Sequence, residues 1–206
     1  MRTWTFITAF GDSAVLLPIT LVIVIWLALF RITATLVWRW LFLLAAVGGL
    51  IAASKLAFMA WGIGIPSLDF TGVSGHSAMS AMLWPLLLAL LGSGGKRYPR
   101  IIGAILGLLF AMAIALSRVV LNAHSWAEVL SGFVLGASAA VVFLSRLGSR
   151  WRIERPYWPP AVALLLVLSI AFGYRFPSER LLHGVAKHLN IDNAVHTRDD
   201  LGARHE

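Results

Sequence analysis

Charged residues are scarce in this chain, and cysteine is absent. Only 13% of the 206 residues are Asp, Glu, Lys or Arg, whereas 59% are hydrophobic. Soluble domains contain about 45–50% apolar residues. The excess excludes a soluble globular fold and indicates an integral membrane protein. The lack of cysteine excludes disulfides, thiolate metal sites and a cysteine nucleophile.

Acidic residues are also few. The chain has 9 Asp and Glu against 17 Lys and Arg, which gives a formal charge of +8. A basic balance is compatible with nucleic-acid binding, but here the basic residues form short clusters between apolar runs. Loops that face the cytoplasm and anionic lipid explain this pattern better. We therefore expect the membrane as a partner and no nucleic acid.

Six apolar segments approach the roughly 20 residues that a membrane-spanning helix needs. They are Ala14–Phe30, Trp40–Trp61, Ser77–Leu91, Ile101–Leu121, Trp126–Leu144 and Ala161–Tyr174. The third and sixth are short, so flanking residues must complete them or the bilayer must thin around them. These segments predict an all-α membrane protein, a six-transmembrane-helix bundle.

Composition divides the chain into two parts. Residues 1–175 contain the six apolar segments, whereas residues 176–206 form a polar C-terminal tail of mixed charge, expected to be a surface helix or disordered. Within the first part, the pairs Gly103/Gly107 and Gly132/Gly136 are each one helical turn apart. Small residues at this spacing let neighbouring helices approach closely.

The loops between the apolar segments differ in basic residues. Six spans place both termini on one side of the membrane, together with the second and fourth loops. The first, third and fifth loops carry nine Lys and Arg residues: Arg31, Arg39, Lys96, Arg97, Arg100, Arg146, Arg150, Arg152 and Arg155. The side of the termini carries six close to the spans: Arg2, Lys55, Arg118 and, near the last span, Arg175, Arg180 and Lys187. Because cytoplasmic loops are enriched in Lys and Arg, we expect the termini to face outward from the inner (plasma) membrane, into the periplasm.

Several polar groups meet at this outward face. Lys55 ends the second span, the stretch FTGVSGHSA (70–78) opens the third, and SRVVLNAHSWAEV (117–129) joins the fourth to the fifth. Ionisable groups at membrane depth are costly and are retained mainly where they pair or function. A lysine, an arginine, two histidines and a glutamate on one side of a bundle indicate an anion site with acid–base groups attached.

Three of these residues suit a bound phosphate. Ser74 is a favourable N-cap, and Gly75 lets backbone approach a ligand closely, so the N–H groups of the helix start can receive phosphate oxygens. Arg118 can hold two of those oxygens through its planar guanidinium.

The histidines and the glutamate suit acid–base chemistry. His124 and Glu128 are four residues apart, so on a helix they share a face and can touch. The carboxylate would accept one ring N–H of His124 and leave the other ring nitrogen to attack phosphorus. His76, from another helix, would protonate the leaving alkoxide.

These motifs together resemble a known family. Ser117-Arg118, five residues, His124, three residues and Glu128 resemble the third signature of the type 2 phosphatidic acid phosphatase family. Ser74-Gly75-His76 resembles its second signature, normally Pro-Ser-Gly-His. The resemblance extends along the whole chain in order and topology. It implies a six-helix enzyme that removes phosphate from a lipid phosphate or pyrophosphate through a phosphohistidine, with no metal or other cofactor.

The resemblance also implies a role for each matching position. The catalytic residues are His124 as nucleophile, Glu128 as its orienting partner and His76 as the leaving-group acid. The phosphate-binding residues are Lys55, Ser74, Gly75 and Arg118. Three positions depart from the family pattern. The first signature, Lys, six residues and Arg-Pro, reads Gly62-Ile63 where Arg-Pro is expected; Val73 replaces the proline of the second; and Glu128 replaces the usual aspartate.

Other functions use the same residues and stay open at this point. A phosphotransferase would move the phosphoryl group to another lipid or sugar. A metal-dependent membrane hydrolase would use His76, His124 and Glu128 as ligands. A non-catalytic lipid-binding or transport protein would keep the fold alone. For the phosphatase, the outward site favours a polyprenyl (undecaprenyl) pyrophosphate carrier, phosphatidylglycerol phosphate or phosphatidic acid. The polyprenyl carrier comes first, because a small enzyme without extra domains suits a ligand that is mostly tail.

Overall fold

Helices make up nearly all of the regular structure in the part of the chain that is described. A computed structural model describes residues 1–29, 34–92, 97–147, 177–189 and 195–202, with single residues at 162 and 169. Within these ranges the only β-type pairing is an isolated bridge between Ile65 and Phe70. The predicted sixth span, Ala161–Tyr174, lies outside the described residues apart from Val162 and Ser169. The prediction of an all-α membrane bundle is confirmed.

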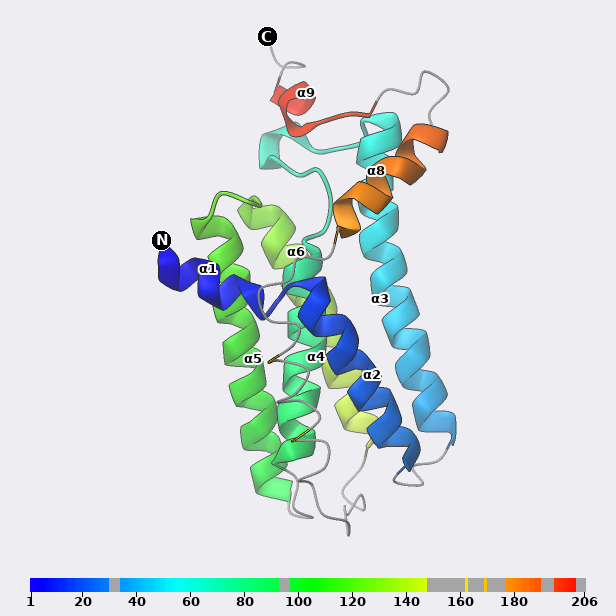
Figure 1. The fold of residues 1–206 in the computed structure, drawn as a ribbon, viewed down its shortest axis with the longest axis vertical. Coiled ribbons are helices and arrows are strands. Elements are labelled where there is room, and N and C mark those ends of the chain that lie inside the picture. Colours follow the sequence, from blue (N-terminus) through cyan, green and yellow to red (C-terminus); the bar gives the residue numbers. More distant parts are fainter. Residues whose placement is uncertain are drawn as a thin grey trace.

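The helices follow the apolar segments closely (Figure 1). In chain order they are α1 (Arg2–Ala9), α2 (Ser13–Leu29), α3 (Ala34–Trp61), the 3-10 turn η1 (Pro66–Leu68), α4 (Gly75–Leu91), α5 (Arg97–Val120), α6 (Trp126–Arg146), α8 (Ser178–Leu189) and α9 (Arg198–Gly202). Four stretches are long and apolar enough to cross a membrane: Arg2–Ala28, Thr35–Trp61, Tyr98–Val120 and Trp126–Arg146. The shorter α4 is also apolar. The protein is therefore a multi-pass membrane protein.

α4 is the buried centre of the bundle. It packs most extensively against α5 and α6, and its residues are buried along most of its length. The predicted glycine pairs make this packing possible. A Cβ at Gly107 of α5 would lie 2.4 Å from the carbonyl oxygen of Trp84, and a Cβ at Gly136 of α6 would lie 1.9 Å from that of Ala78. Both distances are far below van der Waals contact, so only glycine lets these backbones come so close.

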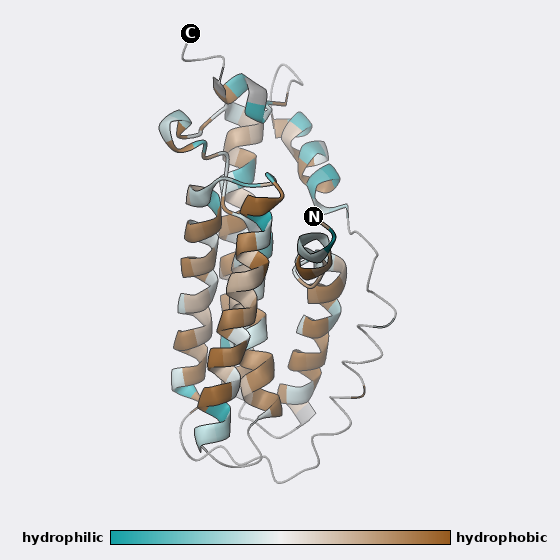
Figure 2. Cartoon of the chain, turned by 90° about the vertical axis from the view of Figure 1, so that its left-hand side faces the viewer, coloured by the Kyte–Doolittle hydropathy of each residue, from teal (hydrophilic) through white to brown (hydrophobic). Residues whose placement is uncertain are grey.

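Hydropathy separates the middle of the bundle from its ends (Figure 2). The long helices are apolar along most of their length, whereas hydrophilic residues gather at the helix ends and on α8. α3 begins six residues before the predicted span and includes the exposed Arg39. Its 28 residues reach about 42 Å at 1.5 Å per residue, more than the roughly 30 Å of a hydrocarbon core. Its ends therefore extend into the polar regions on either side.

The apolar stretch Arg2–Ala28 is broken near its start. Asp12 lies at the break, where its carboxylate accepts the backbone N–H of Ala14 at 2.9 Å and caps α2. α1 consequently turns away from α2 and packs against α5 (Figure 1). Gly11 at the break lies so close to Ile114 and His76 that a Cβ there would stand 2.6 Å and 3.2 Å from their side chains.

Two helical pieces of the C-terminal tail lie at the end of the bundle where α4 begins (Figure 1). α8 packs against α3. α9 is joined to the C-terminal part of α3, because the backbone N–H of His196 donates to the carbonyl of Met59 at 2.9 Å. Leu201 is only 4% exposed. Its side chain lies against Gly64, where an added Cβ would stand 2.9 Å from Leu201 Cδ1.

The glycine contacts yield a stability prediction. Gly136→Ala places a methyl group against the Ala78 carbonyl, so α4 and α6 must move apart, and we expect a loss of about 1–3 kcal/mol in the free energy of unfolding. The matched control is Gly49→Ala on α3, where nothing lies within 4 Å of the new Cβ. There, the better helix propensity of alanine should leave stability unchanged or slightly higher. Thermal unfolding in detergent measures both, and equal midpoints would contradict the close packing.

Candidate active site

The start of α6 holds a histidine and a glutamate in direct contact. His124 lies in the turn before the helix, and its Nδ1 is 2.6 Å from Glu128 Oε2. Ser125 caps α6 by accepting the backbone N–H of Glu128 at 3.3 Å, and the Glu128 carboxylate accepts the N–H of Ser125 at 3.2 Å. This reciprocal capping box fixes the carboxylate relative to the turn. Since Nδ1 is engaged, Nε2 is the ring nitrogen left for chemistry.

Glu128 is fully buried, yet its carboxylate is well supplied with donors. Thr71, in the loop before α4, donates to Oε1 from its backbone N–H at 2.8 Å and from its hydroxyl at 2.5 Å. Arg198, from the C-terminal tail, donates to Oε2 from Nη2 at 2.7 Å. A buried carboxylate keeps its charge only when such partners replace water. The glutamate is therefore held in one orientation against His124.

The start of α4 is bonded to the start of α6. The backbone N–H of Ser74 donates to the carbonyl of Glu128 at 3.1 Å. Ser74 caps α4 as predicted, since its hydroxyl oxygen accepts the Ser77 N–H at 3.4 Å and the Ser77 hydroxyl at 3.0 Å. Gly75 and His76 are the first residues of α4. The N-terminus of this helix, whose first N–H groups have no intrahelical acceptors, therefore lies beside the His124 turn.

His76 and Arg118 both reach the N-terminal part of the chain, His76 at the α1–α2 connection and Arg118 at α1 itself. His76 Nε2 faces Asp12 Oδ2 at 3.9 Å, longer than a hydrogen bond but within the range of an ion pair when the ring is protonated. Arg118, at the end of α5, donates from Nη1 to the hydroxyl of Thr8 at 3.0 Å. The carbonyl of Arg118 also accepts the N–H of His124 at 3.3 Å. The N-terminal helix thus borders the site.

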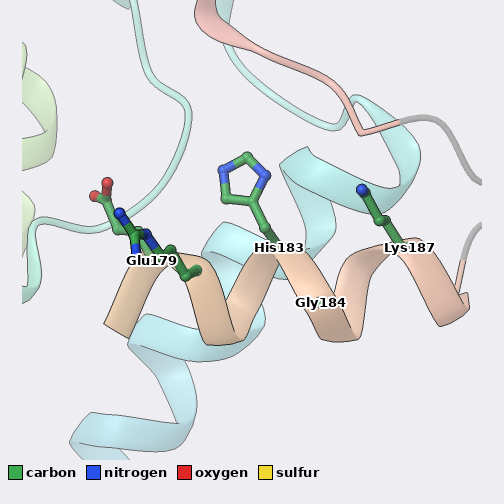
Figure 3. A pocket seen from close by; sticks show the side chains of 5 residues that line it. Glu179, His183, Gly184 and Lys187 are labelled. Carbon is green, nitrogen blue, oxygen red and sulfur yellow. The ribbon is translucent and has the colours of Figure 1, made fainter. Parts of the chain in front are cut away.

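Lys55 is paired with a residue of the tail. Its Nζ lies 3.3 Å from Glu179 Oε1 of α8; the lysine side chain is 14% exposed and the glutamate 67%. The positive charge of Lys55 lowers the pKa of the Glu179 carboxyl below its usual range. Glu179 also lines an open groove on α8 with Arg180, His183, Gly184 and Lys187, and His183 and Lys187 point to the same side of the helix (Figure 3).

The electrostatics of His124 show which of these groups surround it. Burial lowers the pKa of His124, the hydrogen bond and charge of Glu128 raise it, and the charges of Lys55 and Arg118 lower it further. The net direction is downward, so the ring is neutral near pH 7 with a lone pair on one nitrogen. Two cations and one neutral imidazole next to a helix N-terminus form an environment suited to an anion.

The metal-ligand alternative is tested by the donor set. Across the described ranges, no group of three or more His, Cys, Asp and Glu side chains lies close enough to hold a metal ion. His124 and Glu128 bind each other, and Glu128 is further bonded to Thr71 and Arg198. The donors present here suit an anion better than a cation.

The chain is similar to known proteins in its sequence. The profile of the PAP2 superfamily matches residues 60–152. An uncharacterized 22.5 kDa protein in the cps region of Klebsiella pneumoniae is 38% identical over 202 residues, covering 96% of this chain and 97% of that protein. The chain belongs to the PAP2 superfamily. No solved structure matches it.

Membership in the PAP2 superfamily supports a phosphatase-type function on lipid phosphates. The matched region contains the second and third signatures, with Ser74, His76, Arg118, His124 and Glu128, whereas Lys55 precedes it. Gly62, where the first signature would have its arginine, has a φ of 65° and lines a small pocket with residues of the tail, among them His196 and Leu201.

Four residues at the site were not identified from the sequence. Thr71 stands inside the stretch FTGVSGHSA but matches no signature. Asp12 precedes the first predicted span and had no expected role in the site, although it faces His76. Glu179 and Arg198 belong to the polar tail and had no expected role. The one available signal was general: acidic or hydroxyl side chains near an expected cluster of charge at the membrane surface are candidates for pairing.

The Lys55–Glu179 pair generates a binding prediction. Glu179 pairs with the ammonium group of Lys55 that a bound phosphate would use. Glu179→Gln should therefore strengthen the binding of inorganic phosphate about two- to five-fold, which is the range expected for a partly exposed ion pair. In a Lys55→Gln background the same change should bring no gain, since the lysine is then gone. Calorimetric titration of the four proteins measures this. Equal gains in both backgrounds would show that Glu179 does not compete for Lys55.

Proposed function

We propose that this protein is an integral membrane lipid phosphate or pyrophosphate phosphatase that acts through a phosphohistidine. The observation that carries the proposal is the 2.6 Å contact between His124 Nδ1 and the buried Glu128, set among the charges of Lys55 and Arg118. It is the arrangement of a nucleophile, an orienting base and two anion-binding cations.

In the proposed reaction, His124 Nε2 attacks phosphorus in line with the leaving oxygen. The P–N bond forms as the P–O bond to the lipid breaks, and the ring becomes positively charged. Glu128 holds the Nδ1 proton and stabilises that charge, as an orienting carboxylate does for other catalytic histidines. The depressed pKa of His124 favours the step, because only the neutral ring carries the attacking lone pair.

His76 completes the acid–base cycle. In the first step its ring gives a proton to the departing alkoxide, which is a poor leaving group without it. In the second step the neutral ring takes a proton from water as that water attacks phosphorus. The P–N bond then breaks, inorganic phosphate leaves and His124 is restored. The nearby Asp12 carboxylate supports this role, because it stabilises the protonated ring.

The phosphate oxygens are assigned to four groups. Lys55 and Arg118 supply positive charge, and the start of α4, capped by Ser74 and opened by Gly75, supplies backbone N–H groups. Such donors stabilise the charge that builds on the oxygens in the transition state. The donor set also suits a diphosphate. We rank a polyprenyl pyrophosphate carrier before phosphatidylglycerol phosphate and phosphatidic acid, because the described helices form one small apolar bundle that suits a ligand that is mostly tail.

Phosphate release from lipid phosphates by purified protein tests the proposal. Activity should survive chelators and be blocked by vanadate, which mimics the five-coordinate transition state. Loss in chelator that a divalent ion restores would favour a metal-dependent hydrolase. A labelled product formed with an added lipid or sugar acceptor would favour a phosphotransferase, and inactivity on every lipid phosphate would favour a non-catalytic lipid-binding protein.

The two histidines should respond differently to the leaving group. His124→Ala cannot form the phosphoenzyme, so turnover should fall to background for every substrate. His76→Ala should lose most lipid phosphate hydrolysis but retain much more activity on an aryl phosphate, because a nitrophenolate leaves without a proton. Glu128→Gln should fall between them, since an amide orients the ring but does not stabilise its charge.

These comparisons require equal amounts of folded protein, because a charge left without its partner can also destabilise the bundle. Detergent gel filtration and thermal unfolding provide that control. Full aryl phosphatase activity in folded His124→Ala would contradict the phosphohistidine.

The proposed orientation has its own test. Ala123, three residues after the end of α5, and Tyr98, in the first turn of α5, lie near opposite ends of that helix. In this cysteine-free chain, Ala123→Cys should react with an impermeant thiol reagent in cells whose outer membrane is permeable. Tyr98→Cys, at an 80% exposed position, should react only after lysis. The reverse pattern would place the site on the cytoplasmic side.

A further inference from the structure

Arg198 of the C-terminal tail contacts the buried carboxylate of the site. Its Nη2 lies 2.7 Å from Glu128 Oε2, the same oxygen that His124 Nδ1 contacts. Nη2 also lies 3.4 Å from the hydroxyl of Thr71, and Nη1 binds the carboxylate of Asp69. One guanidinium therefore ties the catalytic carboxylate to the loop that precedes α4.

The tail segment that carries Arg198 is itself docked. The backbone N–H of His196 donates to the carbonyl of Met59, and Leu201 is buried. Thr197 donates from its N–H at 2.6 Å and its hydroxyl at 2.9 Å to Asp200, which closes the first turn of α9. These contacts lie on both sides of Arg198 and hold its backbone in place. The guanidinium is thus presented to Glu128 from a fixed segment.

The charges explain what such an arginine does. Glu128 is fully buried, and a buried carboxylate without a balancing cation is strongly destabilising. When His124 is neutral, it offers Glu128 a hydrogen bond but no charge. Arg198 then supplies the positive charge in direct contact with Glu128. With Arg198 in place, Glu128 does not require a protonated His124 beside it.

We propose that Arg198 is a positioning residue of the active site, which lets His124 stay neutral and correctly oriented while Glu128 stays ionised. The expected effect of Arg198 on catalysis rests on the proposed function, whereas its expected effect on the charge states of His124 and Glu128 does not. Arg198 acts through Glu128 and His124 and not on the substrate, so its loss should lower kcat and leave KM nearly unchanged.

The sign of the electrostatic effect follows from the surrounding groups. His124 is acted on by Lys55 from α3, Arg118 from α5, Glu128 from α6 and Glu179 from α8. His76 at the start of α4 faces Asp12, and Asp69 in the loop before α4 binds Arg198. Arg198→Gln leaves these side chains in place and removes one cation from Glu128 and from Asp69. The negative charge of Glu128 is then less compensated and favours the protonated imidazole more strongly, so the pKa of His124 should rise.

The first experiment needs no activity. The titration of His124, assigned with His124→Gln, is followed by NMR of labelled protein in detergent for wild type, Arg198→Gln, Arg198→Lys and Arg146→Gln. We expect the midpoint to move to higher pH in Arg198→Gln and to return most of the way in Arg198→Lys, which restores the charge. Arg146→Gln, at the opposite end of α6 and exposed, should match wild type. An unchanged midpoint in folded Arg198→Gln overturns the proposal.

The second experiment follows phosphate release against pH for the same proteins. In Arg198→Gln the acidic limb should shift to higher pH, and kcat at neutral pH should fall about ten-fold or more, as expected when a hydrogen bond to a charged group is lost. Because Arg198 is 38% exposed, added guanidinium ion should restore part of kcat. A KM effect alone, or loss of activity with no pH shift and no rescue, would assign Arg198 another role.

The two experiments separate the two claims. A shifted His124 titration in a protein that hydrolyses no lipid phosphate would leave the arginine's role intact and overturn the proposed function. Normal hydrolysis with an unshifted titration would do the opposite.

Discussion

The burial of one carboxylate constrains the whole end of the bundle where α4 and α6 begin. Glu128 begins α6 with no exposure to solvent, so every lone pair that water would satisfy needs a donor from the protein. The donors come from Ser125 in the helix cap, Thr71 in the loop before α4, Arg198 in the tail and His124 in the preceding turn. Three segments that are distant in sequence are therefore brought to one point: the loop before α4, the start of α6 and the C-terminal tail.

The same constraint gives the histidine its chemistry. Because Nδ1 of the ring is held against a fixed carboxylate, the direction in which Nε2 points is also fixed. That direction depends on the contacts that the carboxylate makes with other residues, and not only on the contacts of the ring. Burial, assisted by the cations around it, keeps the ring neutral, and in the proposed reaction the carboxylate stabilises the charge that forms after attack. Because the carboxylate is ionised before the reaction begins, little reorganisation is needed as charge develops, which is how preorganised sites lower barriers.

The packing of α4 makes this convergence possible. Gly103 and Gly107 of α5 and Gly132 and Gly136 of α6 let both helices contact the backbone of α4. Without side chains at these contacts, the start of α4 lies close enough to α6 for Ser74 to donate to the Glu128 carbonyl. Close packing in the apolar middle of the bundle thus sets the distance between the start of α4, proposed to bind phosphate, and His124, the proposed nucleophile. The two cationic side chains of the site also have partners within the protein: Lys55 pairs with Glu179, and Arg118 bonds to Thr8.

The sequence by itself determined what is local or periodic. Apolar runs predict α2 to α6, although α3 begins six residues early, and glycines one turn apart predict close helix contacts. Ser74 predicts a cap. The four-residue spacing predicts the His124–Glu128 contact, although His124 lies in the turn before α6 and not on the helix. Only the tertiary structure decided which distant groups complete the site. Thr71 and Glu128 are 57 positions apart, Arg198 and Glu128 are 70, Thr8 and Arg118 are 110, and Lys55 and Glu179 are 124. A single threonine or an arginine in the tail belongs to no periodic pattern, so its position in the sequence does not indicate its partner. The partner depends on how the helices pack and where the tail docks. The physical reason is that residues close in sequence are placed relative to one another by the local geometry of the chain. The contacts around Glu128 depend instead on burying its side chain and pairing its charge, which happens only when all the segments meet.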